Sequence, residues 1–362
     1  MDDTTELSLC DLPGDRNWRR RLVTTPVPFL LAIVAVVTLP VVLPLAALVD
    51  LVVRRRWSVC RTVLLLTYFA LLEALGLLIL CGLWLRRLTG LDEKQYRAAN
   101  RQMQRWWVRR LFDGTVRIFS MSVDIQGRQH LEASAPSVVL SRHANTLDTL
   151  LPPALSRVPK RFRYVMKSEL LVDPALDYCG HRFPNVFVRR GSDSQEREIA
   201  KVVALGHNLA DGDAVVVYPE GTRFSEQKRD RLLAKYRDDE QMRPIVESLH
   251  HTLPPLRRGT IELLASTTGS DVVFIAHRGL EEATDFSDLV TGALTGGRLD
   301  VAIWRVPADA VPRHRKGIRT FLVDHWRHID DYVAGSPPPR GSSDVSRTRP
   351  STSESHQPDA VA

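Results

Sequence analysis

A histidine and an aspartate five residues apart, His143 and Asp148, follow the apolar run 137–140. On one continuous helix their side chains would point about 140° apart, so they can meet only where the chain bends between them. A strand that ends before the histidine and a helix that begins near the aspartate supply this bend. The pair then predicts a histidine base, with an ordinary pKa of about 6.5, that is oriented by a carboxylate and takes a proton from a hydroxyl.

The spacing of this pair is not specific, because His325 and Asp330 repeat it. The second pair lies inside the predicted helix 312–333, on which the two side chains diverge, so we interpret it as surface structure. His143 differs in its position at a predicted strand-to-helix junction. A purely structural role for His143 is the alternative at this point.

A second polar segment, Tyr-Pro-Glu-Gly-Thr-Arg at 218–223, ends a buried-type strand. Gly221 lets the backbone approach a ligand, Thr222 offers a hydroxyl, and Arg223 offers a forked cation that suits phosphate. This turn therefore predicts an anion site, and an ordinary ion pair between Glu220 and Arg223 is the alternative.

Two further cations, Arg189 and Arg190, stand at the end of another predicted strand, 184–189. In open α/β sheets, ligands bind at the carboxyl ends of the strands. The arginines are thus expected at the edge of the sheet that binds ligands.

Short β-rich runs alternate with helical patterns from residue 115 to residue 333, which predicts an α/β fold with one mixed sheet and helices on both faces. The expected strands are 115–125, 137–141, 162–166, 184–189, 214–218, 271–276 and 299–305. The expected helices are 147–157, 194–210, 227–248, 258–267 and 312–333.

Two apolar segments, 26–53 and 62–85, precede this pattern, and each exceeds the roughly 20 helical residues that cross a bilayer. We expect an N-terminal hydrophobic helical hairpin, although Pro40 and Pro44 also allow a kinked or re-entrant segment. Arginines on every flank leave the orientation open. Glu73 inside the second segment has either a functional role or a hydrogen bond between helices.

The chain therefore divides into a basic segment 1–25, a membrane hairpin 26–90, an α/β domain 91–335 and a tail 336–362. The tail is rich in Ser, Pro and Arg and nearly lacks apolar residues, so we expect it to be disordered. At the start of the domain, 91–112 mixes charge with two tryptophans, which suits either an interfacial helix or a helix packed on the core.

The net charge of +7, with 25% charged and 44% hydrophobic residues, is typical of a folded protein with an anionic partner. That partner could be a membrane, a phosphate ligand or a nucleic acid. The sequence has no nucleic-acid-binding motif, so no nucleic-acid partner is expected. The four cysteines are widely spaced and predict neither a disulfide framework nor a metal site.

Taken together, these segments resemble the glycerolipid acyltransferases, a family typified by the 1-acylglycerol-3-phosphate acyltransferases. Its first three motifs have ordered counterparts at His143 and Asp148, at 187–190 and at 218–223. The segment 272–277 takes the place of the fourth motif but lacks its proline. Two residues of the first motif also differ from many members, which have Asn where this chain has Arg142 and often Ser where it has Asn145.

The resemblance implies acyl transfer from acyl-CoA or acyl carrier protein to the free hydroxyl of a lysophospholipid, foremost 1-acylglycerol-3-phosphate, giving phosphatidic acid. His143 would be the base and Asp148 its partner. The acceptor's phosphate would be held by Arg190, Glu220, Gly221, Thr222 and Arg223.

The same resemblance implies no cofactor beyond the thioester co-substrate. It also implies a catalytic domain on the cytoplasmic face of the membrane, where such thioesters occur. The alternatives are acylation of another lysophospholipid or a glycolipid, and a non-catalytic membrane-associated scaffold with the same fold.

Overall fold

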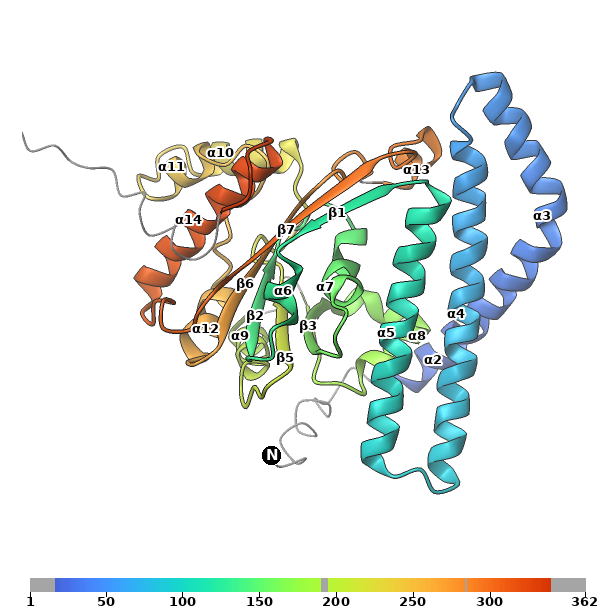
Figure 1. The fold of residues 1–362 in the computed structure, drawn as a ribbon, viewed down its shortest axis with the longest axis horizontal. Coiled ribbons are helices and arrows are strands. Elements are labelled where there is room, and N and C mark those ends of the chain that lie inside the picture. Colours follow the sequence, from blue (N-terminus) through green and yellow to red (C-terminus); the bar gives the residue numbers. More distant parts are fainter. Residues whose placement is uncertain (1–16, 190–194, 284, 340–362) are drawn as a thin grey trace, which may run out of the picture.

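The computed structural model describes residues 17–189, 195–283 and 285–339. Its first elements are the short helix α2 (Trp18–Thr24) and two long helices, α3 (Pro26–Val53) and α4 (Ser58–Leu88). The stretches Trp18–Val53 and Ser58–Leu88 are long and apolar enough to cross a membrane. They form the predicted hairpin at one side of the molecule, and α3 continues through Pro40 and Pro44 along a bent path (Figure 1).

The hairpin is closed by Asp50, which is buried near the end of α3. Its carboxylate accepts hydrogen bonds from the backbone N–H groups of Val59 and Cys60, at 3.1 and 2.9 Å. These N–H groups have no partner inside α4 because they lie in its first turn, so the carboxylate caps that helix.

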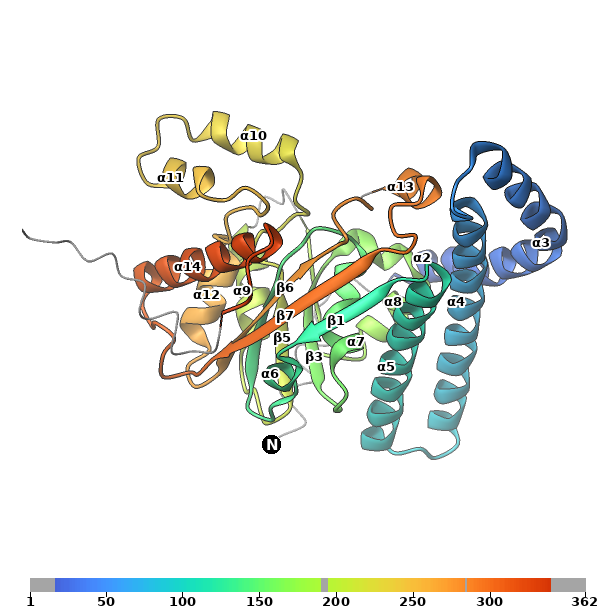
Figure 2. The same ribbon diagram turned by 45° about the horizontal axis from the view of Figure 1, so that its top comes forward.

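Helix α4 lies between α3 and α5 (Glu93–Ile118), and α3 is the outermost of the three (Figures 1 and 2). Only 11% of the most apolar part of Trp18–Val53 is buried, compared with 39% for α4. Glu73 of α4 is buried, and its carboxylate has no hydrogen-bond partner among the described residues. The hydrogen bond between helices that we considered for Glu73 is therefore not formed there.

Helix α2 is fastened to the rest of the molecule by the buried carboxylate of Asp177. Arg20 and Arg21 each bind this carboxylate at 2.9 Å. Asp177 belongs to α8 (Pro174–Gly180), which also contacts α4. Burial alone would raise the pKa of Asp177, but His181, Arg21 and Arg20 together hold it well below its ordinary value.

Seven strands within the described residues form one sheet, in the order β1-β7-β6-β2-β5-β3-β4. Neighbouring strands are parallel except β6 and β7, which are antiparallel. The strands are β1 (Ser122–Gln126), β2 (Ser137–Ser141), β3 (Arg161–Lys167), β4 (Val186–Val188), β5 (Asp213–Val217), β6 (Asp271–Arg278) and β7 (Arg298–Val306). The predicted α/β class with a mixed sheet is confirmed.

Helices cover both faces of the sheet. Alternate residues of its central strands point to opposite sides and pack against these helices. Val138 and Leu140 pack in one core with residues of α9, α12 and α14, whereas Val139 packs in the other with Phe119 and residues of α7. The helices named are α7 (Leu151–Leu155), α9 (Gln195–Ala204), α12 (Arg258–Ser266) and α14 (Arg315–Val333). Figure 1 shows α12 and α14 on the side of the sheet away from α5.

Some predicted boundaries are wrong. Residues 115–118, predicted as strand, are the last turn of α5, and β1 begins at Ser122. The predicted helix 227–248 is broken into α10 (Glu226–Lys235) and α11 (Met242–Glu247). Asp239 lies in the break and accepts a hydrogen bond from the Met242 N–H, an alternative to a continuous helix.

Several short elements escaped the sequence analysis, because segments this short show no helical periodicity. They are α2, α6 (Arg128–Glu132), the 3₁₀ turn η2 (Ser168–Val172), α8 and α13 (Phe286–Thr291), and another 3₁₀ turn, η1 (Leu147–Leu150), precedes α7. Most of the predicted tail 336–362 lies outside the described residues, as does most of the segment 1–25.

Candidate functional site

The register of the three central strands places three polar side chains at the same level along the strand direction. Leu140 of β2 is aligned with Val217 of β5 and with Phe274 of β6. Three residues beyond each aligned position stand His143, Glu220 and His277. Because these strands are parallel, the three residues gather at the carboxyl edge of the sheet.

His143 and Asp148 meet at this edge through the bend predicted between them. The Nδ1 atom of His143 lies 2.9 Å from Oδ1 of Asp148. Asp148 stands in η1, and its side chain is fully buried, while that of His143 is 17% exposed. An Nδ1–H that donates to the carboxylate leaves Nε2 as the nitrogen able to take a proton.

The second oxygen of Asp148 is held by the backbone. Oδ2 accepts hydrogen bonds from the N–H groups of Ala144 and Asn145, at 2.6 and 2.7 Å. Burial would raise the pKa of this carboxyl, but the imidazoles of His143 and His277 outweigh burial and lower it to about 2. Asp148 is therefore a carboxylate at neutral pH, as an orienting partner for an imidazole must be.

The turn after β5 is tied to the histidine loop from both sides. Oε1 of Glu220 accepts a hydrogen bond from the His143 N–H at 3.1 Å, and the Phe224 N–H donates to the His143 carbonyl at 2.8 Å. Oε2 of Glu220 accepts from the Leu253 N–H at 3.1 Å. Glu220 is buried, so its side chain braces the loop rather than facing a ligand.

The rest of this turn is more open. Gly221 has a φ of 66°, and a Cβ there would lie 2.3 Å from Nε of Arg257, so glycine is required on both counts. Arg223 donates to Oγ1 of Thr146 at 3.3 Å, which places its guanidinium beside the histidine loop. Thr222 and Arg223 are partly exposed, as an anion site needs.

Two cations that the sequence analysis missed lie beside the same turn. Nζ of Lys228, in α10, is 3.1 Å from Oγ1 of Thr222 and 2.7 Å from the Arg223 carbonyl. Arg257 donates from Nε to the Glu220 carbonyl at 3.3 Å. The five-residue step from Arg223 to Lys228 was visible in the sequence, but Arg257 is brought here by a separate loop.

Arg190, the remaining predicted phosphate ligand, lies outside the described residues. Its neighbour Arg189 is exposed directly after β4. Strand β4 is at the end of the sheet order, two strands away from β5.

The second pair of His and Asp is not a site of the same kind. His325 and Asp330 do diverge, but the predicted surface position is wrong because both are buried. His325 accepts a hydrogen bond from the Trp304 indole at 3.2 Å, and Asp330 accepts from the Thr252 hydroxyl at 2.8 Å. Each side chain thus ties α14 to a different part of the domain.

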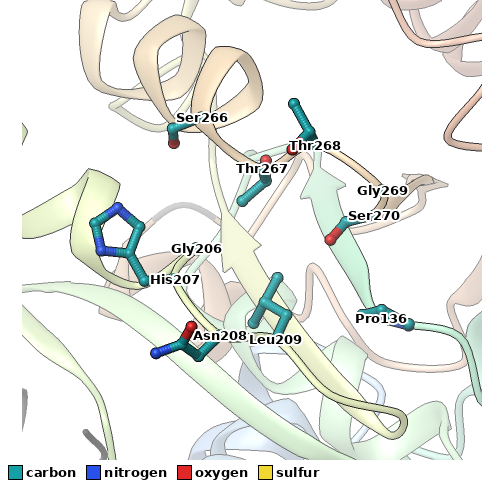
Figure 3. A pocket seen from close by; sticks show the side chains of 10 residues that line it. All are labelled: Pro136, Gly206, His207, Asn208, Leu209, Ser266, Thr267, Thr268, Gly269 and Ser270. Atoms are coloured by element: carbon teal, nitrogen blue, oxygen red, sulfur yellow. The ribbon is translucent and has the colours of Figure 1, made fainter.

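A hollow of about 340 Å³ lies away from this edge (Figure 3). Pro136 and Ser270, which line it, directly precede β2 and β6, so the hollow is at the amino edge of the sheet. It is therefore separate from the site around His143. Among the described residues, no group of three His, Cys, Asp or Glu side chains could hold a metal ion.

Comparison with known proteins agrees with this architecture. Residues 122–275 match the family model described as Acyltransferase, a range that includes His143, Asp148 and the turn 218–223. The solved structure of the 1-acyl-sn-glycerophosphate (LPA) acyltransferase PlsC from Thermotoga maritima is similar in fold, with a TM-score of 0.51 and 15% identity. That similarity covers 76% of this chain and 98% of PlsC.

A curated relative is the probable 1-acyl-sn-glycerol-3-phosphate acyltransferase 5 of Arabidopsis thaliana, 25% identical over 173 residues. The aligned part is 47% of this chain and 44% of the relative, so this chain spans less than half of that protein. Residues 122–275 are therefore similar to an acyltransferase domain, and the matched relative is a probable glycerolipid acyltransferase.

Proposed function

We propose that this protein transfers a fatty acyl group from acyl-CoA or acyl carrier protein to the free hydroxyl of a lysophospholipid. The foremost acceptor is 1-acylglycerol-3-phosphate, and the product is then phosphatidic acid. The observation that carries the proposal is the 2.9 Å contact between His143 and Asp148, beside a turn that presents Thr222 and Arg223.

In this reaction, Nε2 of His143 takes the proton of the acceptor hydroxyl as its oxygen attacks the thioester carbonyl carbon. The C–S bond breaks, and the departing thiolate takes the proton from the imidazolium. Asp148 keeps the imidazole oriented and stabilises its charged form. The transfer is direct, with no acyl-enzyme, and needs no cofactor beyond the thioester.

The acceptor's phosphate is held at the open turn after β5. Arg223 supplies a forked guanidinium, and Lys228 supplies a compact positive charge. Gly221 lets the backbone approach the phosphate, and Thr222 offers its hydroxyl. Holding the phosphate there fixes the acceptor beside His143, which lowers the entropic barrier of transfer. Arg190 is proposed as a further ligand from its place in the sequence motif.

The hairpin of α3 and α4 anchors the protein to the membrane that contains the acceptor. Residues along α3 such as Leu30, Val37 and Val52 are more than half exposed, which suits contact with lipid. Since thioester donors are cytosolic, the domain faces the cytoplasm. Digestion of a tag placed near residue 91 in inside-out vesicles supports this orientation, and protection of the tag contradicts it.

The reaction is tested by incubating the purified protein with labelled acyl-CoA or labelled acyl carrier protein and a panel of lysophospholipids and lysoglycolipids. Labelled phosphatidic acid, formed faster than any other product, is the expected result. A different labelled product would redirect the acceptor assignment. No labelled lipid with any acceptor, from either thioester donor, would favour a scaffold with the same fold.

A further inference from the structure

A second histidine, His277, lies behind Asp148. Its side chain is fully buried at the carboxyl end of β6, and Nε2 lies 3.6 Å from Oδ2 of Asp148. Asp148 thus stands between two imidazoles, with His143 at Oδ1 and His277 on the side of Oδ2.

The proton on His277 can be assigned from its contacts. Nε2 is 3.2 Å from the carbonyl oxygen of Arg142, which can only accept a hydrogen bond, so Nε2 carries a hydrogen. The hydrogen is therefore on the nitrogen closest to Asp148. The other nitrogen, Nδ1, is buried without a hydrogen-bond partner among the described residues. An apolar side chain would fill this space without burying an unsatisfied nitrogen, so packing alone does not explain an imidazole here.

The end of β6 that carries His277 is clamped to the histidine loop by Arg142, whose side chain is also fully buried. Its guanidinium donates to the carbonyl of His277 at 2.8 Å and to that of His251 at 2.9 Å, and pairs with Glu281. This contact network fixes the distance between β2 and β6 where both histidines emerge.

We propose that His277 is a positioning residue for Asp148. Its Nε2–H donates to the Arg142 carbonyl, which places the positive edge of the imidazole 3.6 Å from Oδ2. This edge supports the orientation that the N–H groups of Ala144 and Asn145 give the carboxylate, so that Oδ1 stays directed at His143. The proposal rests on the proposed function, because its effect is seen in the rate of acyl transfer. His277 does not contact substrate and acts through Asp148.

The test compares His277→Leu with His277→Gln in the full-length protein. The two replacements are similar in size, but only glutamine has an N–H donor that can reach the place of Nε2. The matched control is His325→Leu, which removes another buried imidazole packed against Phe274 of the same strand. For each variant, kcat and both KM values are measured with acyl-CoA and 1-acylglycerol-3-phosphate, together with Tm.

We expect kcat of His277→Leu to fall roughly tenfold, because the buried carboxylate loses a polar neighbour that holds its orientation, with both KM values nearly unchanged. His277→Gln should recover most of this loss. His325→Leu should lower Tm at least as much as His277→Leu but keep kcat near that of the wild type.

Wild-type kcat in His277→Leu, or equal losses of kcat in the leucine and glutamine variants, would overturn the role of His277 and leave the proposed function standing. A raised KM with unchanged kcat would also overturn it. Absence of acyl transfer by the wild-type protein would instead overturn the proposed function, and with it this role.

Discussion

Glu220 accepts a hydrogen bond from the backbone N–H of His143 at 3.1 Å, while its other oxygen accepts one from Leu253 at 3.1 Å. The side chain therefore joins the turn after β5 to the histidine loop and to a third segment of the chain. Its buried position makes the folded state sensitive to pH.

Burial raises the pKa of Glu220 to about 8, against the opposing effects of Arg142 and of the N–H groups of His143 and Leu253. The folded protein therefore retains a proton that the unfolded chain releases above its ordinary pKa of 4.5. The contribution of this group to stability is complete below pH 4.5 and is lost as the pH rises to about 8. We expect Tm of the wild type to fall relative to that of Glu220→Gln across this window, and parallel Tm curves for the two proteins would contradict it.

The phosphate role of Arg223 predicts a selective effect of Arg223→Lys. Lysine keeps the charge but loses the fork, so KM for 1-acylglycerol-3-phosphate should rise several-fold, by roughly 1 kcal/mol of binding, with KM for acyl-CoA unchanged. Arg243→Lys is the control, since Arg243 is exposed and pairs with Glu247 on the same helix. Unchanged acceptor kinetics in Arg223→Lys would exclude Arg223 from the phosphate site.

A buried ion pair at the amino edge of the sheet predicts a large effect on stability. Asp213 is buried and binds Arg163, itself buried, at 2.8 Å. Asp213→Ala leaves the buried guanidinium of Arg163 without this carboxylate and should lower the free energy of unfolding by about 3–5 kcal/mol. Asp324→Ala, which breaks an exposed pair with Arg327, should change it by less than about 1 kcal/mol. Equal losses of unfolding free energy for the two variants in urea denaturation would contradict the claim that burial makes the Arg163–Asp213 pair more important.

The exposed apolar side of α3 predicts how the protein attaches to membranes. The double change Val37→Asp and Val41→Asp places two charges where the side chains are 71% and 64% exposed. Binding to liposomes in a flotation assay should fall severalfold without loss of Tm, because each charge opposes insertion by about 2–4 kcal/mol at the bilayer centre. The double change to leucine is the control. Wild-type flotation of the aspartate variant would show that α3 does not enter lipid.

How far the sequence predicted the fold depends on the element. Strand β2 was predicted with its observed limits and β5 to within one residue, because both are continuous apolar runs buried on two faces. The residues Thr115, Val116 and Ile118 have β-branched side chains that favour strands, yet α5 continues through them. Its packing against α4 and α7 outweighs that preference.

The candidate site divides in the same way. His143 and Asp148 could be found because they lie five residues apart, one just after a predicted strand and the other in the first turn of the helix that follows. The places of His277 and Glu220 depend on the register of β2 with β5 and β6, and Arg257 is brought to the site by a separate loop. No local sequence pattern reveals either relationship. The burial of His325 was missed because the sequence analysis assigned this polar residue to the surface, whereas the buried face of α14 includes it.

The central claim, that His143 is the base, is tested most directly by kcat of purified His143→Ala for acyl transfer from acyl-CoA to 1-acylglycerol-3-phosphate. We predict a fall of about a hundredfold or more, with Tm near that of the wild type and a comparable loss in Asp148→Asn. Near-normal turnover by folded His143→Ala would contradict the account.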